Sequence, residues 1–249
     1  MSRDASILAS TQLKPINLSK PPNHAVIILA SGLSLRLGQA KQLLCKDGEP
    51  LICFMTKLAL STKPQAIIIV IPDNQPSIAS AMNELAFQYS MIQMVVNPTP
   101  EIGMAYSLNL AIEAVTQLTG SLIERVVIMG VDQVLLDEQH LVKLLADKRS
   151  VVASAYGSWQ QTFHLNNMNL NETSAATVLK QNIIGLPLTI DCDLLREWQA
   201  LLVGDKGLRY LIRGLPPSQI STVVNHQLSY DIDTPEQLAH AKQKGWLDK

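Results

Sequence analysis

The feature of this sequence that most constrains its fold is a regular alternation of short apolar runs, rich in β-branched residues, with longer stretches of helical periodicity. The runs predict strands and the stretches between them predict amphipathic helices. Such alternation is typical of a parallel sheet joined by right-handed crossovers. The predicted strands are Ala25–Ala30, Ala66–Ile71, Ile92–Val96, Arg125–Met129 and Ser150–Ala155, and the predicted helices are Pro50–Leu60, Ser77–Tyr89, Met104–Leu118 and Glu138–Ala146.

The core of this sheet must be built from aliphatic side chains. Hydrophobic residues make up 47% of the chain but aromatic residues only 4%. That balance suits a buried parallel sheet covered by helices on both faces. We therefore expect a three-layer α/β/α, Rossmann-like fold with a mostly parallel sheet.

Residues 24–249, which include this sheet, are expected to form a single domain, preceded by a flexible extension over residues 1–23. A polar segment at about 157–184 is expected to be a loop or lid with one short helix near Ser174–Lys180. Helices are expected at Leu188–Leu202 and Leu208–Leu215, and a late strand at Ile220–Val224. The last helix is predicted to begin at Thr234, with Pro235 in its first turn and Gln237 completing a capping box.

Composition and charge exclude several classes of function. A formal net charge of −1 gives no broad attraction for nucleic acid. No apolar run approaches the roughly 18 residues that span a membrane. Three cysteines and five histidines lack metal-type spacing. We expect a cytoplasmic protein with free thiols and no zinc site.

The first predicted strand runs directly into a loop that carries two glycines and two cations. In an α/β sheet this loop lies at the carboxyl edge, where ligands bind. Gly32 and Gly38 allow close approach of the backbone, whose N–H groups can bind phosphate oxygens. Arg36 and Lys41 add charges for a triphosphate. An ordinary strand-to-helix turn with solvated cations is the alternative that spacing alone leaves open.

Acidic residues are predicted to reach the same edge of the sheet. Asp132 follows a buried strand, and its carboxylate could hold a hard cation such as Mg²⁺, although an Asp here is as often a turn former. Asp231 and Asp233 lie two positions apart and would face one side of an extended segment. We assign Asp231 to the metal, whereas Asp233 could bind the metal or support the following helix.

A glycine and a hydroxyl open the helix that begins near Met104. Gly103 and Ser107 could hydrogen-bond a base edge and exclude a bulky ring. Taken alone this signal is weak, because a serine near a helix start usually caps it.

Four elements occur in a fixed order along the chain: LASGLSLRLGQAKQLL from Leu29, Gly-Met-x-x-Ser-Leu at 103–108, Gly-Asp-x-Gly-x-Arg at 204–209 and Asp-Ile-Asp-Thr-Pro-Glu at 231–236. This set resembles the nucleotidyltransferase family that builds molybdenum dinucleotide cofactors, whose opening loop reads Leu-Ala-Ala-Gly-x-Ser-x-Arg-Met-Gly-x-x-Lys-x-Leu-Leu. Ser31 and Leu37 depart from that pattern. The Arg-to-Lys spacing and the second glycine element resemble the cytidylyltransferases within it.

Two further departures concern the turn after the fourth strand and the acceptor side. Val134 stands where the family usually has the proline of Asp-Gln-Pro, which predicts a looser turn. Gly185-Leu186-Pro187 follows the long polar segment rather than a short turn.

The resemblance implies that the terminal phosphate of a molybdopterin-type acceptor attacks CTP and releases pyrophosphate, with Mg²⁺ as cofactor and a molybdenum enzyme as a possible recipient of the product. It assigns Arg36 and Lys41 to catalysis and Asp132 and Asp231 to the metal. Asp233, Asp205 and Arg209 are assigned to the metal or the acceptor side. The residues assigned to the nucleotide are Leu29, Ala30, Ser31, Gly32, Ser34, Gly103 and Ser107.

Other functions stay open at this point. The enzyme could use GTP, or another phosphorylated small molecule as acceptor, as methylerythritol phosphate cytidylyltransferases and sugar nucleotidyltransferases do. A catalytically silent molybdenum-cofactor chaperone would also keep the fold.

Overall fold

The computed structural model of the protein describes residues 22–118, 122–157, 183–204 and 207–249. Within this part of the chain, seven strands form one sheet in the order β5-β4-β1-β6-β8-β7-β9. All neighbouring strands are parallel except for the pairs that β8 makes with β6 and β7. The strands are β1 His24–Leu29, β4 Ala66–Pro72, β5 Ile92–Asn97, β6 Arg125–Gly130, β7 Val151–Tyr156, β8 Ile183–Asp191 and β9 Ile220–Val224.

Helices cover both faces of this sheet, as the alternation of apolar runs predicts. Successive residues of a strand point to opposite faces, so Ala25 and Ile27 pack into one core and Val26 and Ile28 into the other. The first core is closed by α3 Met104–Thr116, α7 Cys192–Trp198 and α8 Gly207–Arg213. The second is closed by α1 Leu51–Ser61, α2 Pro76–Gln88 and α4 Glu138–Ala146. The predicted three-layer, mostly parallel fold is confirmed.

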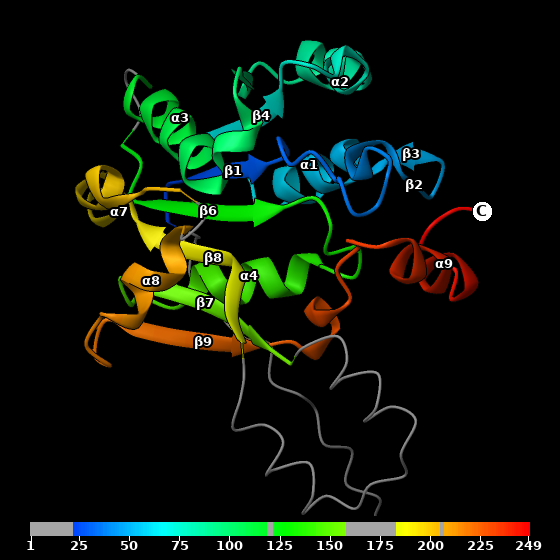
Figure 1. Cartoon of the computed structure of the whole chain (residues 1–249). Helices are drawn as coiled ribbons and strands as arrows, with labels where there is room; N and C mark the ends of the chain where they lie inside the picture. The colour runs from blue at the N-terminus through cyan, green and yellow to red at the C-terminus, as the bar shows by residue number, and fades with distance from the viewer. Residues whose placement is uncertain (1–21, 119–121, 158–182, 205–206) are drawn as a thin grey trace, which may run out of the picture.

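Strand β1 lies at the centre of the arrangement and is parallel to both β4 and β6. Figure 1 shows β1, β6, β7 and β9 pointing the same way, toward the side where α9 lies. The segments that follow β1 and β6 therefore leave the same edge of the sheet side by side. This is the switch point at which open α/β sheets bind ligands.

The predicted helix Leu188–Leu202 was wrong for its first four residues, and residues 183 and 184, which were predicted to lie in the polar loop, also belong to a strand. Leu188–Asp191 belongs to the antiparallel strand β8 and not to a helix, which begins only at Cys192 and is followed by the short helical turn Gln199–Leu201. Gly185 and Pro187 interrupt the apolar pattern and conceal the strand. A register shift opposite Ala153 and Ser154 accommodates Pro187, which has no N–H to donate to a ladder.

The other late elements agree with the sequence pattern. Helix α8 and strand β9 are confirmed, with α8 beginning at Gly207. The predicted helix Ser174–Lys180, most of the polar segment, Asp205 and nearly all of the predicted N-terminal extension lie outside the described residues. No helix in the described ranges is both long and apolar enough to cross a membrane.

The C-terminal helix α9 Pro235–Gln243 packs against the loop that follows β1. Thr234 caps it, and both hydrogen bonds of the predicted capping box with Gln237 are present. Leu238 and Ala241 share a small core with Leu37 of the loop and with Val134. The last residues continue to the hairpin of β2 Cys45–Lys46 and β3 Glu49–Pro50. The C-terminal segment thus packs against both the loop after β1 and the hairpin that follows it.

Candidate active site

The conformation of the loop from Ala30 to Lys41 is fixed by two tight turns within it and by hydrogen bonds to Gln42. Ser34 and Gly38 adopt φ values of +53° and +76°, which turn the chain back on itself. The buried Gln42 amide donates to the carbonyls of Ala30 (2.6 Å) and Gly32 (2.9 Å). These two bonds fix the start of the loop against its end. Gln42 was given no such role by sequence reasoning, because a single glutamine carries no pattern.

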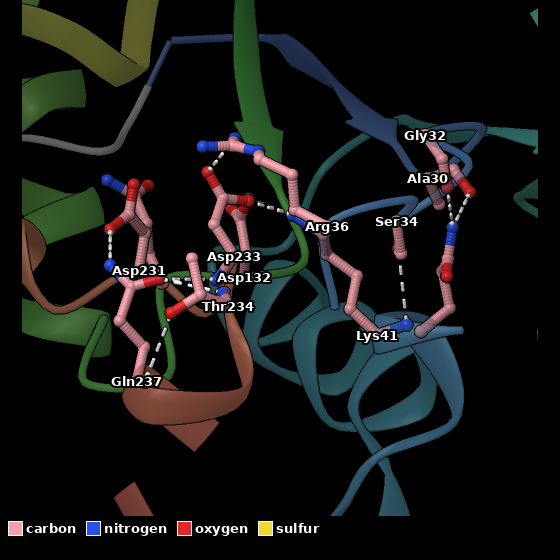
Figure 2. A network of polar contacts seen from close by, with 12 residues as sticks. Ala30, Gly32, Ser34, Arg36, Lys41, Asp132, Asp231, Asp233, Thr234 and Gln237 are labelled. Atoms are coloured by element: carbon pink, nitrogen blue, oxygen red, sulfur yellow. Dashed lines mark hydrogen bonds and ion pairs between the residues drawn. The ribbon is translucent and has the colours of Figure 1, made fainter. Parts of the chain in front are cut away.

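Three carboxylates from two distant segments meet the cations of this loop (Figure 2). Lys41 Nζ lies 2.9 Å from Asp132 Oδ2 and 2.7 Å from Asp233 Oδ1. Arg36 lies outside, its side chain 72% exposed, and pairs with Asp233 Oδ2 at 2.6 Å. Asp231 Oδ1 accepts a hydrogen bond from Gln237 Nε2 at 3.3 Å. Asp132, Asp231 and Asp233 therefore converge as predicted, although Asp233 binds the loop cations here.

The segment carrying Asp132 is fixed in place. Gly130 makes room for the carboxylate, since a Cβ there would lie 2.9 Å from Asp132 Oδ1. The Asp132 carbonyl accepts from Ile232 N, and Val134 is fully buried with its carbonyl bound by Lys46 Nζ at 2.6 Å. The predicted loosening of this turn by Val134 is not seen, because Lys46 and the small core hold it.

Charge is unevenly balanced over the three carboxylates. Burial and the neighbouring Asp132 and Asp233 raise the pKa of Asp231 to about 6. Burial acts to raise the pKa of Asp233 too, but Lys41 and Arg36 outweigh it and lower that pKa. Burial acts to lower the pKa of Lys41, but the negative charges of Asp132 and Asp233 have the larger combined effect and raise it. Asp231 is thus the carboxylate that lacks a sufficient countercharge.

These residues fit a hard divalent cation. Carboxylate oxygens are the ligands that Mg²⁺ and Mn²⁺ prefer, and Mg²⁺ usually takes one or two of them together with substrate phosphates. In the described part of the chain no group of three or more acidic, His or Cys side chains forms a ready metal cage. A cation shared between Asp132, Asp231 and a nucleotide would supply the countercharge that Asp231 lacks.

A buried hydroxyl pair lies at the other end of the loop. Ser31 Oγ and Ser107 Oγ are 2.7 Å apart, and the fully buried Asn97 donates Nδ2 to Ser107 Oγ at 3.0 Å. Gly103 precedes α3 with a φ of +113°, a conformation that suits glycine. Asn97 was missed because the predicted strand stopped at Val96; a polar residue at the end of a buried strand was the available signal.

Two neighbouring cavities meet at this site. The first, about 400 Å³, is lined by most residues assigned to the nucleotide together with Lys41, Asp132 and Asp233. The second, about 320 Å³, is lined by Asp231 and Arg209 and by the apolar ends of β6, β8 and α8. Leu29, Met104 and Leu186 line both. Ser34 and Arg36 line neither; the Ser34 hydroxyl instead accepts from Lys41 N at 3.4 Å.

The fold resembles several solved structures across nearly the whole chain. Rv0371C complexed with manganese, from Mycobacterium tuberculosis, is 18% identical over 88% of this chain and 97% of its own, with a TM-score of 0.60. A nucleotidyl transferase from Methanothermobacter thermautotroptrophicus, Mth528, is 16% identical over 90% and 97%, with a TM-score of 0.66. The 4-diphosphocytidyl-2C-methyl-D-erythritol synthase of Anaerococcus prevotii is 16% identical over 90% and 96%, with a TM-score of 0.61. At these identities the likeness shows the fold alone.

The family of this chain is shown by a match of its sequence to a family model. No curated protein matches the chain. Residues 26–222 match the model of the MobA-like NTP transferase domain. This range includes the loop after β1, Asp132 and most of the residues that line the two cavities, while Asp231 and Asp233 lie beyond it. The chain belongs to the family of MobA-like NTP transferase domains and is a nucleotidyltransferase.

Proposed function

We propose that this nucleotidyltransferase transfers CMP from CTP to the terminal phosphate of a molybdopterin-type acceptor in the cytoplasm. Mg²⁺ would be held by Asp132 and Asp231. The observation that carries the proposal is the position of the carboxylates: Asp132 lines one cavity, Asp231 lines the other, and the two cavities adjoin. A nucleotide in the first cavity and an acceptor in the second would meet between these two side chains.

Phosphate transfer needs positioning and charge more than proton removal. A phosphate monoester is largely ionised near neutral pH, with a second pKa of about 6. One of its oxygens attacks the α-phosphorus of the nucleotide. The bond from that phosphorus to the bridging oxygen breaks, and pyrophosphate leaves with the bonding electrons. No general base is required, which fits a cluster built only of carboxylates and cations.

The loop residues would hold the triphosphate during this displacement. The Lys41 ammonium lies in the first cavity with only 12% of its side chain exposed, so its charge is weakly screened. It would stabilise the negative charge that grows on the leaving pyrophosphate. Arg36, exposed at the mouth of the loop, would bind the outermost phosphate. The bound cation would add Lewis-acid stabilisation of the phosphoryl oxygens.

The base and the sugar would lie toward Ser31 and Ser107. Asn97 Nδ2 already donates to Ser107, so one hydroxyl hydrogen of the Ser31–Ser107 pair stays available to a ligand. The resemblance to the cytidylyltransferases supports CTP, whose base presents a carbonyl acceptor.

Pyrophosphate release tests the proposal directly. The full chain is incubated with Mg²⁺ and each of CTP, GTP, ATP and UTP, with and without molybdenum-loaded molybdopterin. We expect release that depends on both CTP and the acceptor. Release with GTP alone would replace the cytidylyl assignment with a guanylyl one, and binding of the cofactor without any release would favour a chaperone.

A further inference from the structure

Lys46 is a partly buried cation that has no part in the displacement proposed above. It lies in the hairpin that follows the loop, and it lines neither of the two cavities. Its Nζ donates to the carbonyl of Val134 at 2.6 Å and lies 4.2 Å from the centre of the Phe54 ring in α1. None of the ion pairs among the described residues includes Lys46. Its charge is therefore held by a carbonyl oxygen and an aromatic face.

The carboxylates of the same hairpin do not hold this lysine. Glu49 pairs with Lys57 of α1, and Asp47 is exposed at the tip of the turn. Burial lowers the pKa of Lys46, which shows that its charge is unfavourable where it lies. The bond to the Val134 carbonyl offsets part of this cost, because a charged donor makes a strong hydrogen bond. The side chain thus binds the backbone of another segment and not a neighbouring acid.

The Val134 carbonyl belongs to the turn that carries Asp132. Leu136 N donates to the Gln133 carbonyl at 2.9 Å and closes this turn from within. Valine does not fix its own φ, as a proline would. The bond from Lys46 therefore restrains the turn from outside, two residues after the Asp132 carboxylate.

The C-terminal segment binds the same hairpin from the other side. Asp248 N donates to the Cys45 carbonyl at 2.9 Å. The Asp248 carboxylate accepts from the N–H groups of Asp47 (3.1 Å) and Gly48 (2.9 Å). Figure 1 shows the end of the chain beside β2 and β3. One hairpin thus contacts both the Asp132 turn and the segment that follows α9.

Building on the metal site proposed above, we infer that Lys46 is a positioning residue for that site: its bond to the Val134 carbonyl fixes Asp132 relative to Lys41. Lys41 lies five residues before Lys46 in the sequence, and its Nζ is 2.9 Å from Asp132 Oδ2. Metal sites depend on the groups that orient their ligands, and loss of such a group typically lowers metal affinity about 10–100-fold. Removal of the Lys46 donor should therefore loosen the turn and weaken metal binding.

Mn²⁺ binding to the full chain tests the inference. The titration is done with the non-hydrolysable nucleotide α,β-methylene-CTP present, and the unbound ion is measured by its electron paramagnetic resonance signal. Lys46→Met keeps most of the aliphatic stem and removes the donor, and it should weaken Mn²⁺ binding about tenfold. Lys46→Arg keeps a donor and a cation that can stack on Phe54, and its affinity for Mn²⁺ should stay within about threefold of the wild type. Without metal, all three proteins should bind the nucleotide with the same affinity, because Lys46 lines neither cavity.

Hydrogen exchange in the metal-free protein locates the effect. The amides of residues 130–136 should exchange about tenfold faster in Lys46→Met, because the turn loses a charge-assisted hydrogen bond. Asp248→Ala removes the acceptor of the hairpin tip and should change both measurements in the same direction by a smaller factor. Lys57→Met is the matched control, since it removes an exposed cation that is bound to Glu49 of the same hairpin. It should leave both measurements within about twofold of the wild type.

Three outcomes would overturn the inference. The first is Mn²⁺ affinity within about twofold of the wild type in Lys46→Met. The second is an equal loss in Lys57→Met or in Lys46→Arg, which would leave the donor of Lys46 without a special role. The third is weaker Mn²⁺ binding with unchanged exchange at residues 130–136, which would point to charge alone and not to position.

The two proposals can fail separately. Acceptor-dependent pyrophosphate release from CTP, together with wild-type Mn²⁺ binding in Lys46→Met, would refute the inference and leave the proposed function intact. Weaker Mn²⁺ binding and faster exchange in Lys46→Met, when the wild type releases no pyrophosphate from any nucleotide, would refute the proposed function alone.

Discussion

Replacing Asp231 by Asn should stabilise the metal-free protein and abolish its use of metal. The two side chains have nearly the same shape, and Asn keeps the oxygen that accepts from Gln237. What is lost is a negative charge that burial and the nearby Asp132 and Asp233 make unfavourable, as the rise of the Asp231 pKa from 3.8 to about 6 shows.

The size of the effect follows from that rise. A change from 3.8 to about 6 corresponds to about 3 kcal/mol. Partial exposure of the site reduces this to about 1–2 kcal/mol. For a chain of this length the melting temperature should rise by about 2–8 °C.

The sign depends on pH. The folded-state pKa of Asp231 lies above the unfolded one, so protonation favours the fold, and the stability that it contributes is lost as pH rises through about 6. The gain in unfolding free energy of Asp231→Asn over the wild type should therefore be small near about pH 4, about half of its full value near pH 5 and at its full value above about pH 7.

Thermal unfolding followed by circular dichroism at several pH values measures this directly. Asp73→Asn, which removes an exposed surface carboxylate, is the control and should show no such pH dependence. Added Mg²⁺ with CTP should stabilise the wild type and not Asp231→Asn. A variant that is less stable than the wild type at pH 8, or equally more stable at pH 4 and pH 8, would refute the charge argument.

Three further substitutions test other parts of the site. Asp132→Ala should abolish nucleotidyl transfer and leave the far-ultraviolet dichroism unchanged; near wild-type turnover in the folded variant would remove Asp132 from the metal site. Ser107→Ala should raise the KM for the nucleotide on the order of tenfold with a smaller change in kcat, because it removes the hydroxyl partner of Asn97; steady-state kinetics distinguishes this from an effect on kcat alone. Thr234→Ala should cost about 1 kcal/mol of unfolding free energy through loss of the cap of α9, and an unchanged denaturation midpoint would contradict that role.

Strands β1, β4, β6 and β7 were predictable because nearly every residue of their apolar runs is buried on both faces of the sheet. The edge strand β5 is only partly buried, but its apolar run was still recognisable. A continuous apolar run of this kind predicts a buried strand even when the strands that pair with it are not known. Strand β8 was not predictable in this way, because Gly185 and Pro187 break the run. Its pairing with β7 also includes a register shift, because Leu186 and Pro187 are extra residues opposite Ala153 and Ser154.

The convergence of Asp132, Asp231 and Lys41 followed from topology. The segments that follow parallel strands all lie at the same edge of the sheet. That shared position is sufficient to bring these charged residues together. The supporting polar residues were not accessible by the same reasoning. Gln42 and Asn97 take their roles from carbonyl and hydroxyl partners that are set by the tertiary fold.

We propose that the carboxylates and Lys41 catalyse attack at the α-phosphorus of a nucleoside triphosphate. CTP labelled at the α-phosphorus and CTP labelled at the γ-phosphorus, each incubated with Mg²⁺, molybdopterin and the full chain, test it most directly. We expect the α label in the acceptor product and the γ label in pyrophosphate. Appearance of the γ label on the acceptor or in free phosphate, with the α label left in CDP, would contradict it.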